Sequence, residues 1–217
     1  MISKRVVRPL AGVVLTVAMA ASLSGCGINS IPTKEEAAKA KWGQVNAAYQ
    51  YRNDLIPQLV ATVKGGAANE RSILTDVISA RASATRVSVD ASSISDPAKF
   101  QQYQQAQNTV GAALGRLMVI QEKYPDLKSN QGFTDLMVAI NGAQSRILIA
   151  QRDYNDSAQD YNTSLRTFPT VVWAKTMYGS AKPLPYFTSS DASTAVPGTA
   201  GKAPTIDMSD VGAPASK

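Results

Sequence analysis

The sequence predicts an all-α protein, built as an antiparallel four-helix up-and-down bundle with long helices and a disordered C-terminal tail. Hydrophobic residues recur at steps of three and four over long stretches, and turn residues separate these stretches. Aromatic residues make up only 6% of the chain, and Ala, Gln and Ser are common, which favours helices over sheets. The 217 residues suffice for one ordinary domain with short extensions.

We expect four parts along the chain. They are a lipoprotein signal peptide at 1–25, a lipid-anchored linker at 26–32, a helical bundle at 33–187 and a disordered tail at 188–217. The tail is predicted because the composition turns to Pro, Ser, Thr, Ala and Gly after Pro183, and no helical or strand period follows Thr188.

The first segment has the three parts of a bacterial signal peptide. Basic residues lie at the start, an uncharged stretch runs from Leu10 to Leu23, and small residues precede Cys26. The uncharged stretch is about 14 residues long, whereas a membrane-spanning helix needs roughly 20. We therefore expect this segment to be cleaved rather than kept as a membrane span.

The sequence Leu23-Ser24-Gly25-Cys26 resembles the lipobox of bacterial lipoproteins. The resemblance implies cleavage between Gly25 and Cys26, with S-diacylglycerol and an N-acyl chain added to Cys26. Two or three acyl chains give stable membrane anchoring where one gives only reversible binding. The alternative is a signal peptide of the non-lipid kind with an incidental cysteine. Gly27 in the following position favours the periplasmic face of the outer membrane if the host is Gram-negative.

The first helix is expected to start at Thr33, whose spacing to Glu36 is that of a capping box. Pro57 should kink this helix, and Gly65-Gly66 offers a stop. An uninterrupted, bent helix through Gly65 is the alternative. Its buried face is predicted to carry Trp42, Val45, Tyr49, Ile56, Leu59 and Val63.

Arg52 occupies the one polar position on that face. One interpretation is that its stem packs while the guanidinium extends outward to water. The other is a buried ion pair with a carboxylate on another helix.

Three further helices are predicted. The second runs from Asn69 to about Ala91, the third starts at Pro97 and ends before Tyr124-Pro125, and the fourth runs from Gln131 to Phe168 before Pro169. The core positions of the second helix are Ile73, Val77, Ala80, Ala84 and Val87, and those of the third are Tyr103, Val110, Leu114, Leu117 and Ile120. The core positions of the fourth helix are Phe133, Leu136, Ile140, Ala143, Ile147, Ala150, Tyr154, Ala158, Tyr161, Leu165 and Phe168.

The composition excludes several kinds of chemistry. The chain has no histidine, so Ser-His and Cys-His nucleophile pairs and histidine-containing metal sites cannot form. The single cysteine excludes an intramolecular disulfide and any multi-cysteine metal site. The net charge of +6 falls to +3 without the three basic residues of the signal segment, too balanced to predict nucleic-acid binding. We expect no metal and no cofactor.

Two groups of polar residues are candidates for a site. Carboxylates could carry hydrolysis without histidine, but their contexts favour surface or capping roles, and we name no catalytic residue. They are Glu35, Glu36, Glu70, Asp153 and Asp156. The second group repeats after seven residues on one helix face and is explained by bundle packing or, alternatively, by a surface that binds a partner. It consists of Tyr154, Asn155, Tyr161 and Asn162.

Several segments together resemble the LemA family over about residues 29–187. The motifs that carry the resemblance are Asn29 with Ile31-Pro32-Thr33, Trp42-Gly43-Gln44-Val45, the run from Asp54 to Gly65, Ala80-Arg81-Ala82, Tyr124-Pro125-Asp126-Leu127-Lys128 with Phe133, Arg152-Asp153-Tyr154-Asn155, and Tyr161-Asn162-Thr163 with Arg166 and Phe168-Pro169. The resemblance implies a membrane-associated antiparallel four-helix bundle whose molecular role is largely undefined.

The chain departs from the family pattern at two places. Most relatives carry an amino-terminal transmembrane helix where this sequence has the lipobox, so we expect the bundle to lie outside the cytoplasm. Asn141 and Gln144 stand where relatives commonly have glutamates, so any binding role of those acids is in doubt here.

The sequence thus predicts an extracytoplasmic lipoprotein that is not an enzyme and acts as a scaffold or interaction module at the membrane surface. Its partners would be the membrane, through the covalent lipid, and an envelope protein, with self-association left open. The alternatives are an accessory subunit of an envelope protease or stress-response system, or an enzyme with an unrecognised site.

Overall fold

The computed structural model describes residues 27–64, 71–121 and 129–188, and the helices and strands assigned within them are all helices, as predicted. The helices are α2 (Ser30–Lys64), α3 (Arg71–Arg86), α4 (Pro97–Gln121), α6 (Gln131–Ser164) and α7 (Thr170–Thr176). The predicted signal peptide with its cleavage site at Gly25 and Cys26, the stop at Gly65-Gly66, the N-cap Asn69, Glu70, the Tyr124-Pro125 turn and the tail from residue 189 lie outside the described residues.

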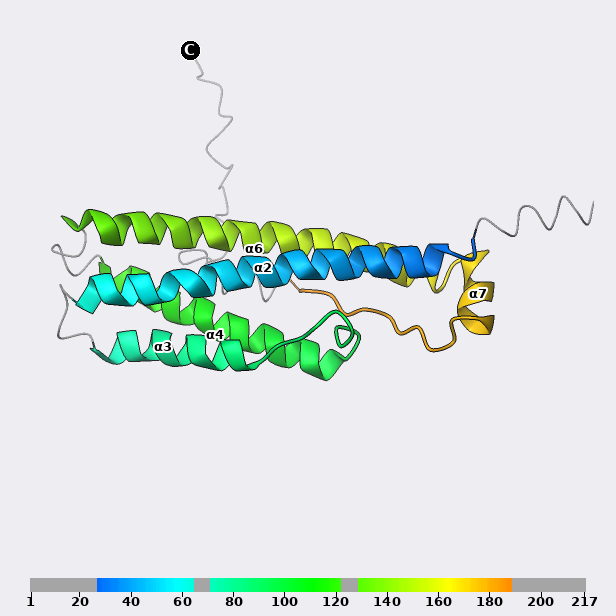
Figure 1. Ribbon diagram of the computed structural model, residues 1–217, viewed down its shortest axis with the longest axis horizontal. Helices are drawn as coiled ribbons and strands as arrows, with labels where there is room; N and C mark the ends of the chain where they lie inside the picture. The colour runs from blue at the N-terminus through cyan, green and yellow to red at the C-terminus, as the bar shows by residue number, and fades with distance from the viewer. Residues whose placement is uncertain (1–26, 65–70, 122–128, 189–217) are drawn as a thin grey trace, which may run out of the picture.

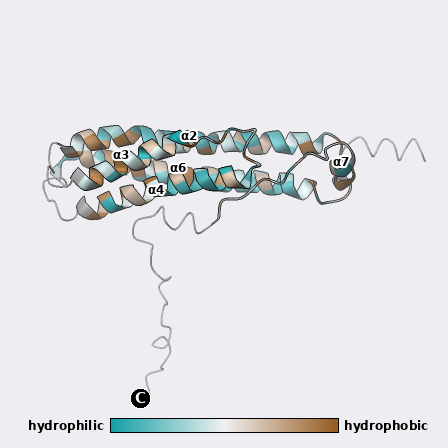
Figure 2. Ribbon diagram, turned by 90° about the horizontal axis from the view of Figure 1, so that it is seen from below, coloured by the Kyte–Doolittle hydropathy of each residue, from teal (hydrophilic) through white to brown (hydrophobic). Residues whose placement is uncertain are grey.

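The four long helices lie side by side, and α2 and α6 extend beyond α3 and α4 to the short helix α7, which lies next to the start of α2 (Figure 1). The most extensive contact joins α2 to α6, and the second joins α3 to α4. Each long helix carries both hydrophilic and hydrophobic residues along its length (Figure 2), as expected of helices with one buried face. None of the helices in the described ranges combines the length and the hydrophobicity that a membrane span requires.

Contacts between side chains set the directions of the helices. Lys41 and Arg52 of α2 meet Asp153 and Gln144 of α6, so these two helices run in opposite directions. The Arg81 side chain donates to the carbonyl of Asn53 at 2.8 Å, and the Trp42 indole donates to the carbonyl of Val89. The chain therefore reverses between α2 and α3, and the alternative of one uninterrupted helix is wrong.

The start of α2 differs from the prediction. The helix begins at Ser30, and the Thr33 hydroxyl, already inside it, donates to the carbonyl of Asn29 at 2.7 Å. Glu36 does not reach back to the helix start but pairs with Lys39 at 2.8 Å. The predicted capping box is wrong because a threonine one turn into a helix bonds to the preceding turn instead. The helix continues through Pro57.

The other helix boundaries follow their caps. The Asn130 side chain accepts from the N–H of Phe133 at 3.1 Å and starts α6 at Gln131, as predicted. Asp96 accepts from the N–H of Ala98 at 3.0 Å and starts α4 at Pro97, also as predicted. Helix α3 ends at Arg86, before the predicted Ala91.

The end of α6 also comes early. The helix stops at Ser164, where the chain turns toward Pro169. Phe168, placed in the core by its spacing, is 82% exposed. That prediction is wrong because the helical period no longer applies once the helix has ended.

Two hydrophobic cores fill the helical body. The aromatic core lies on the side of α7, and its larger members are Ile31, Trp42, Tyr49, Ile94, Phe100, Tyr103, Ile147, Tyr154, Tyr161, Leu184 and Phe187. The aliphatic core lies on the other side and contains Ile56, Leu59, Val60, Val63, Leu74, Val77, Ala80, Ala84, Val110, Ala113, Leu114, Leu117, Phe133, Met137 and Ile140. The predicted helix faces account for most of both cores. Ile73, Val87, Leu136 and Leu165 are only partly buried, and the side chain of Ile120 lies outside the described part.

A buried arginine lies between the two cores. Arg52 is 2% exposed, so its guanidinium does not extend to water, and its partners are amides rather than a carboxylate. It donates to the carbonyl and side-chain oxygens of Gln107 at 3.0 and 2.9 Å and to Gln144 at 3.3 Å, over the ring of Tyr49. Both interpretations drawn from the sequence are therefore wrong. Burial lowers the pKa of Arg52 to about 10, because the charged form loses hydration.

Candidate functional site

The candidate site is an extended segment, residues 183–188, that lies against α6. The sequence Pro183-Leu184-Pro185 favours this conformation, because a residue before proline is driven out of the helical region. Prolines also lack an N–H, so the N–H groups of Leu184 and Phe187 are among the few main-chain donors that remain in the segment.

Two asparagines of α6 hold the main chain of this segment. Asn162 donates to the carbonyl of Leu184 and accepts from its N–H, both at 2.8 Å. Asn155 does the same for Phe187, both at 2.9 Å. We call Asn155 and Asn162 the asparagine clamp. Each amide makes the paired contacts that a neighbouring strand would make, so α6 binds the chain as a sheet edge would.

The spacing of the two asparagines matches the spacing of the residues that they hold in the 183–188 segment. Seven residues of an α-helix rise about 10.5 Å, and three residues of an extended chain advance about 10 Å. Asparagines seven apart on α6 therefore meet residues three apart in the segment. Because the contacts are to main-chain atoms, the clamp recognises an extended backbone, and specificity must come from the side chains beside it.

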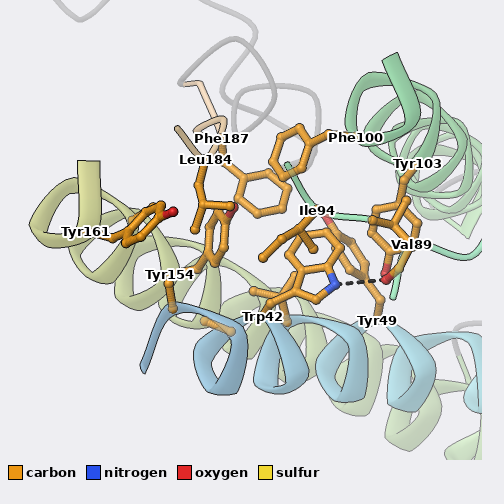
Figure 3. Close-up of a cluster of buried hydrophobic side chains, with 14 of the residues drawn as sticks. Trp42, Tyr49, Val89, Ile94, Phe100, Tyr103, Tyr154, Tyr161, Leu184 and Phe187 are labelled. Atoms are coloured by element: carbon orange, nitrogen blue, oxygen red, sulfur yellow. Dashed lines mark hydrogen bonds between the residues drawn. The ribbon is translucent and has the colours of Figure 1, made fainter. Parts of the chain in front are cut away.

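Those side chains enter the aromatic core. Phe187 is 7% exposed and packs against Trp42, Phe100 and Tyr154, with ring centroids 6.0, 4.9 and 5.7 Å apart (Figure 3). Leu184 is buried beside it. The Tyr154 hydroxyl donates to the carbonyl of Pro185 at 3.1 Å, and burial raises the pKa of Tyr154 well above its usual range.

The structure brings the four predicted surface residues to one face of α6. Tyr154, Asn155 and Asn162 contact the 183–188 segment, and Tyr161 is buried in the aromatic core, where burial raises its pKa to about 12. The binding of a partner protein by this face stays a prediction. Sequence reasoning missed the segment itself. The signal that could have found it is the pair of apolar residues three apart, Leu184 and Phe187, among prolines.

An open groove of about 670 Å³ lies between α4 and the 183–188 segment, next to Thr188. Its α4 side is rich in amide side chains, and none of the described residues that line it is charged. The lining consists of Pro97, Phe100, Gln101, Gln104, Gln105, Asn108, Thr109 and Ala112 of α4 with Pro185, Tyr186 and Thr188.

The four described carboxylates of those considered from the sequence lie on the surface. Glu35 and Glu36 both pair with Lys39, at 2.9 and 2.8 Å, and these hydrogen bonds raise the pKa of Lys39. Asp153 pairs with Lys41 at 3.0 Å, and Asp156 is exposed. In the described ranges, three or more His, Cys, Asp or Glu residues nowhere gather as a metal site would require.

Comparison with known proteins gives a family. The model of the LemA family matches residues 41–200, which is most of the chain. The match includes the clamp, the 183–188 segment and the groove.

Three curated relatives are magnetosome proteins. MamQ of Magnetospirillum gryphiswaldense is 27% identical over 161 residues, covering 65% of this chain and 58% of its own length. MamQ 1 and MamQ 2 of Paramagnetospirillum magneticum are each 36% identical over 59 residues, covering 27% of this chain. The chain spans only 22% of the length of these two relatives.

Proposed function

The chain belongs to the LemA family, and we propose that it is a lipid-anchored interaction module of a bacterial cell envelope, without enzymatic activity. The groove beside α4 carries this proposal, because amide side chains line one wall and the asparagine clamp holds the extended 183–188 segment as the other. In this proposal the four long helices form an antiparallel up-and-down bundle that supports the clamp.

The ligand we propose is an extended segment of an envelope protein, bound in the groove beside α4. Amide side chains both donate and accept, so they suit the alternating N–H and C=O groups of an extended backbone. The described residues of the lining carry no charge that would select an ionic small molecule. In this proposal the 183–188 segment, held by the clamp, forms one wall of the groove.

Site-specific photo-crosslinking in cells tests the binding role. A crosslinking residue replaces Gln105, which is exposed in the groove, and the matched control replaces Gln58, which is exposed on α2. We expect a defined protein adduct from the groove position only, and its loss when Asn155→Ala and Asn162→Ala release the wall of the groove. Equal labelling from both positions would contradict a binding groove, and substrate turnover by the purified protein would contradict a purely non-enzymatic role.

The anchor is tested separately. We propose that Cys26 carries S-diacylglycerol and an N-acyl chain after removal of residues 1–25 and that the helices lie outside the cytoplasm, on the periplasmic face of an outer membrane if the host is Gram-negative. Cys26→Ser should abolish labelling by palmitate and leave uncleaved precursor. Mature-sized soluble protein from this variant would show that the signal peptide is of the non-lipid kind.

A further inference from the structure

The end of the helical body next to the chain's first described residue carries exposed hydrophobic side chains. Residues 165–182, which we call the α7 cap, include Phe168, Val172 and Met177, exposed by 82%, 46% and 58%. The other large hydrophobic residues exposed in the described ranges are spread along the sides of the long helices and at Tyr186. The described part of the chain thus leaves three large hydrophobic side chains exposed within ten residues of sequence.

The α7 cap touches Gly27, the first residue that the structure describes. A Cβ atom on Gly27 would lie 3.6 Å from the indole nitrogen of Trp173 and 3.7 Å from Thr170. Cys26 precedes Gly27 by one peptide bond, which fixes their Cα atoms about 3.8 Å apart. Acyl chains on Cys26 would therefore enter the bilayer within a few ångströms of the cap.

The charges of the cap suit an anionic surface. Arg166, Lys175 and Lys182 are all exposed, and residues 165–182 contain no Asp or Glu. Exposed hydrophobic residues flanked by cations and a tryptophan are typical of protein surfaces that lie in the headgroup region of a membrane.

We propose that the α7 cap is a lipid-contacting surface, in which Phe168, Val172 and Met177 enter the interfacial region of the bilayer and the cations bind anionic headgroups. Its place beside the anchor rests on the proposed lipidation of Cys26. With contact at this end, the long helices extend away from the membrane, because α7 lies at the end of α2 and α6 (Figures 1 and 2). The asparagine clamp and its groove then face the aqueous side.

Tryptophan fluorescence tests the contact. The lipidated protein is reconstituted into vesicles of phosphatidylcholine and phosphatidylglycerol in which the phosphatidylcholine is brominated near the headgroup. Trp173 lies in the cap, whereas Trp42 is 1% exposed in the aromatic core. We expect brominated lipid to quench the native protein strongly, and the Trp173→Phe variant, which reports Trp42 alone, to be quenched little.

Two variants with matched exposure sharpen the result. Phe168→Ser with Val172→Ser should reduce the quenching of Trp173, whereas Val138→Ser with Ile149→Ser, at similarly exposed positions on α6, should not. Because all four side chains are exposed, these variants should fold. In protein that lacks the acyl chains, the affinity for vesicles should fall about tenfold for each hydrophobic side chain of the cap that is replaced by Ser. This figure takes about half of each side chain as inserted in the bilayer.

The outcomes separate this proposal from the proposed anchor. Protein that fails to float with the vesicles has lost the anchor. Protein that floats while Trp173 stays unquenched overturns the lipid-contacting cap and leaves the anchor intact. Crosslinking of one cap to another, again without quenching, would assign the patch to a second copy of the chain.

Discussion

The two cores of the helical body differ in composition and in what they hold together. The aliphatic core joins helices to helices mainly through branched side chains, and Phe133 is the one ring among its buried residues in the described ranges. The aromatic core also binds chain that is not helical, from Val89 and Ile94 before α4 to Leu184 and Phe187 after α7. Rings are suited to this task because each buries a large area and contacts several elements at once. The difference indicates that the candidate site depends on the aromatic core.

Trp42→Ala should have the largest effect. The ring contacts Phe100, Tyr103, Tyr154 and Phe187 within about 6 Å between centroids, and its N–H donates to the carbonyl of Val89 at 2.8 Å. We expect the free energy of unfolding to fall by about 4–5 kcal/mol, measured by chemical denaturation.

The matched substitution in the aliphatic core is Leu59→Ala, which should cost about 2–4 kcal/mol. The two variants should differ in kind as well. Trp42→Ala should speed amide hydrogen exchange at Phe187 before global unfolding, and Leu59→Ala should not. Equal exchange at Phe187 in both variants would show that the clamp does not depend on the aromatic core.

Alkaline pH should weaken the aromatic core selectively. Burial raises the pKa of Tyr161 from 10 to about 12 and those of Tyr103 and Tyr154 further. A raised pKa contributes stability that is present below the unfolded value, near 10, and is lost as the pH rises through the folded value. Arg52 acts in the opposite direction, because its pKa is lowered to about 10, but it is one group against three.

The expected result is a loss of roughly 2 kcal/mol of unfolding free energy between pH 9 and pH 11, since each proton contributes about 1.4 kcal/mol per pH unit. Thermal unfolding across this range checks it. Tyr154→Phe should flatten the dependence, because it removes one of the three hydroxyls that titrate. A variant with an unchanged slope would exclude Tyr154 from this response.

The buried arginine between the cores offers the next test. Gln144→Glu would place a carboxylate where an amide oxygen now lies 3.3 Å from the guanidinium of Arg52. We expect a gain of about 1 kcal/mol at neutral pH, because the buried cation gains a counter-charge. The pKa of that glutamate would be lowered, so the gain should be present above about pH 4.3 and lost as the pH falls through the folded value.

Asn141→Glu is the matched control for this substitution. Asn141 lies three residues before Gln144 on the same helix, and it is exposed. The same charge there should change the free energy of unfolding little. If both variants stabilise equally, the gain comes from net charge and not from Arg52.

Helical periodicity predicted the parts of the structure that depend on helices alone. The faces through Trp42 and Leu59, the start of α4 at Pro97 and the start of α6 at Gln131 follow from spacing and capping chemistry. The burial of Arg52 and its amide partners do not follow from periodicity, which gives the face of a residue but not its depth of burial or its partners on distant helices.

The candidate site could be predicted only in part. The repeat of Asn155 and Asn162 after seven residues is visible in the sequence, and it indicated a polar surface on one helix. Its occupant was not visible, because the 183–188 segment has no helical or strand period and its contacts join residues 22 or 32 positions apart. Main-chain recognition leaves little trace in side-chain patterns.

The smallest expected effect lies on the surface of the aliphatic side. Arg116 and Asp76 join α4 to α3 at 3.5 Å, and both side chains are more than half exposed, so Asp76→Asn should change the free energy of unfolding by less than about 0.5 kcal/mol. Lys41 and Asp153 join α2 to α6 beside the aromatic core at 3.0 Å with about one third exposure, and Asp153→Asn should cost about 1 kcal/mol. At 1 M salt, the effect of Asp76→Asn should vanish and the effect of Asp153→Asn should shrink, because salt screens the more exposed pair more completely. A larger effect at Asp76 would mean that the aliphatic side depends on surface charge more than its packing indicates.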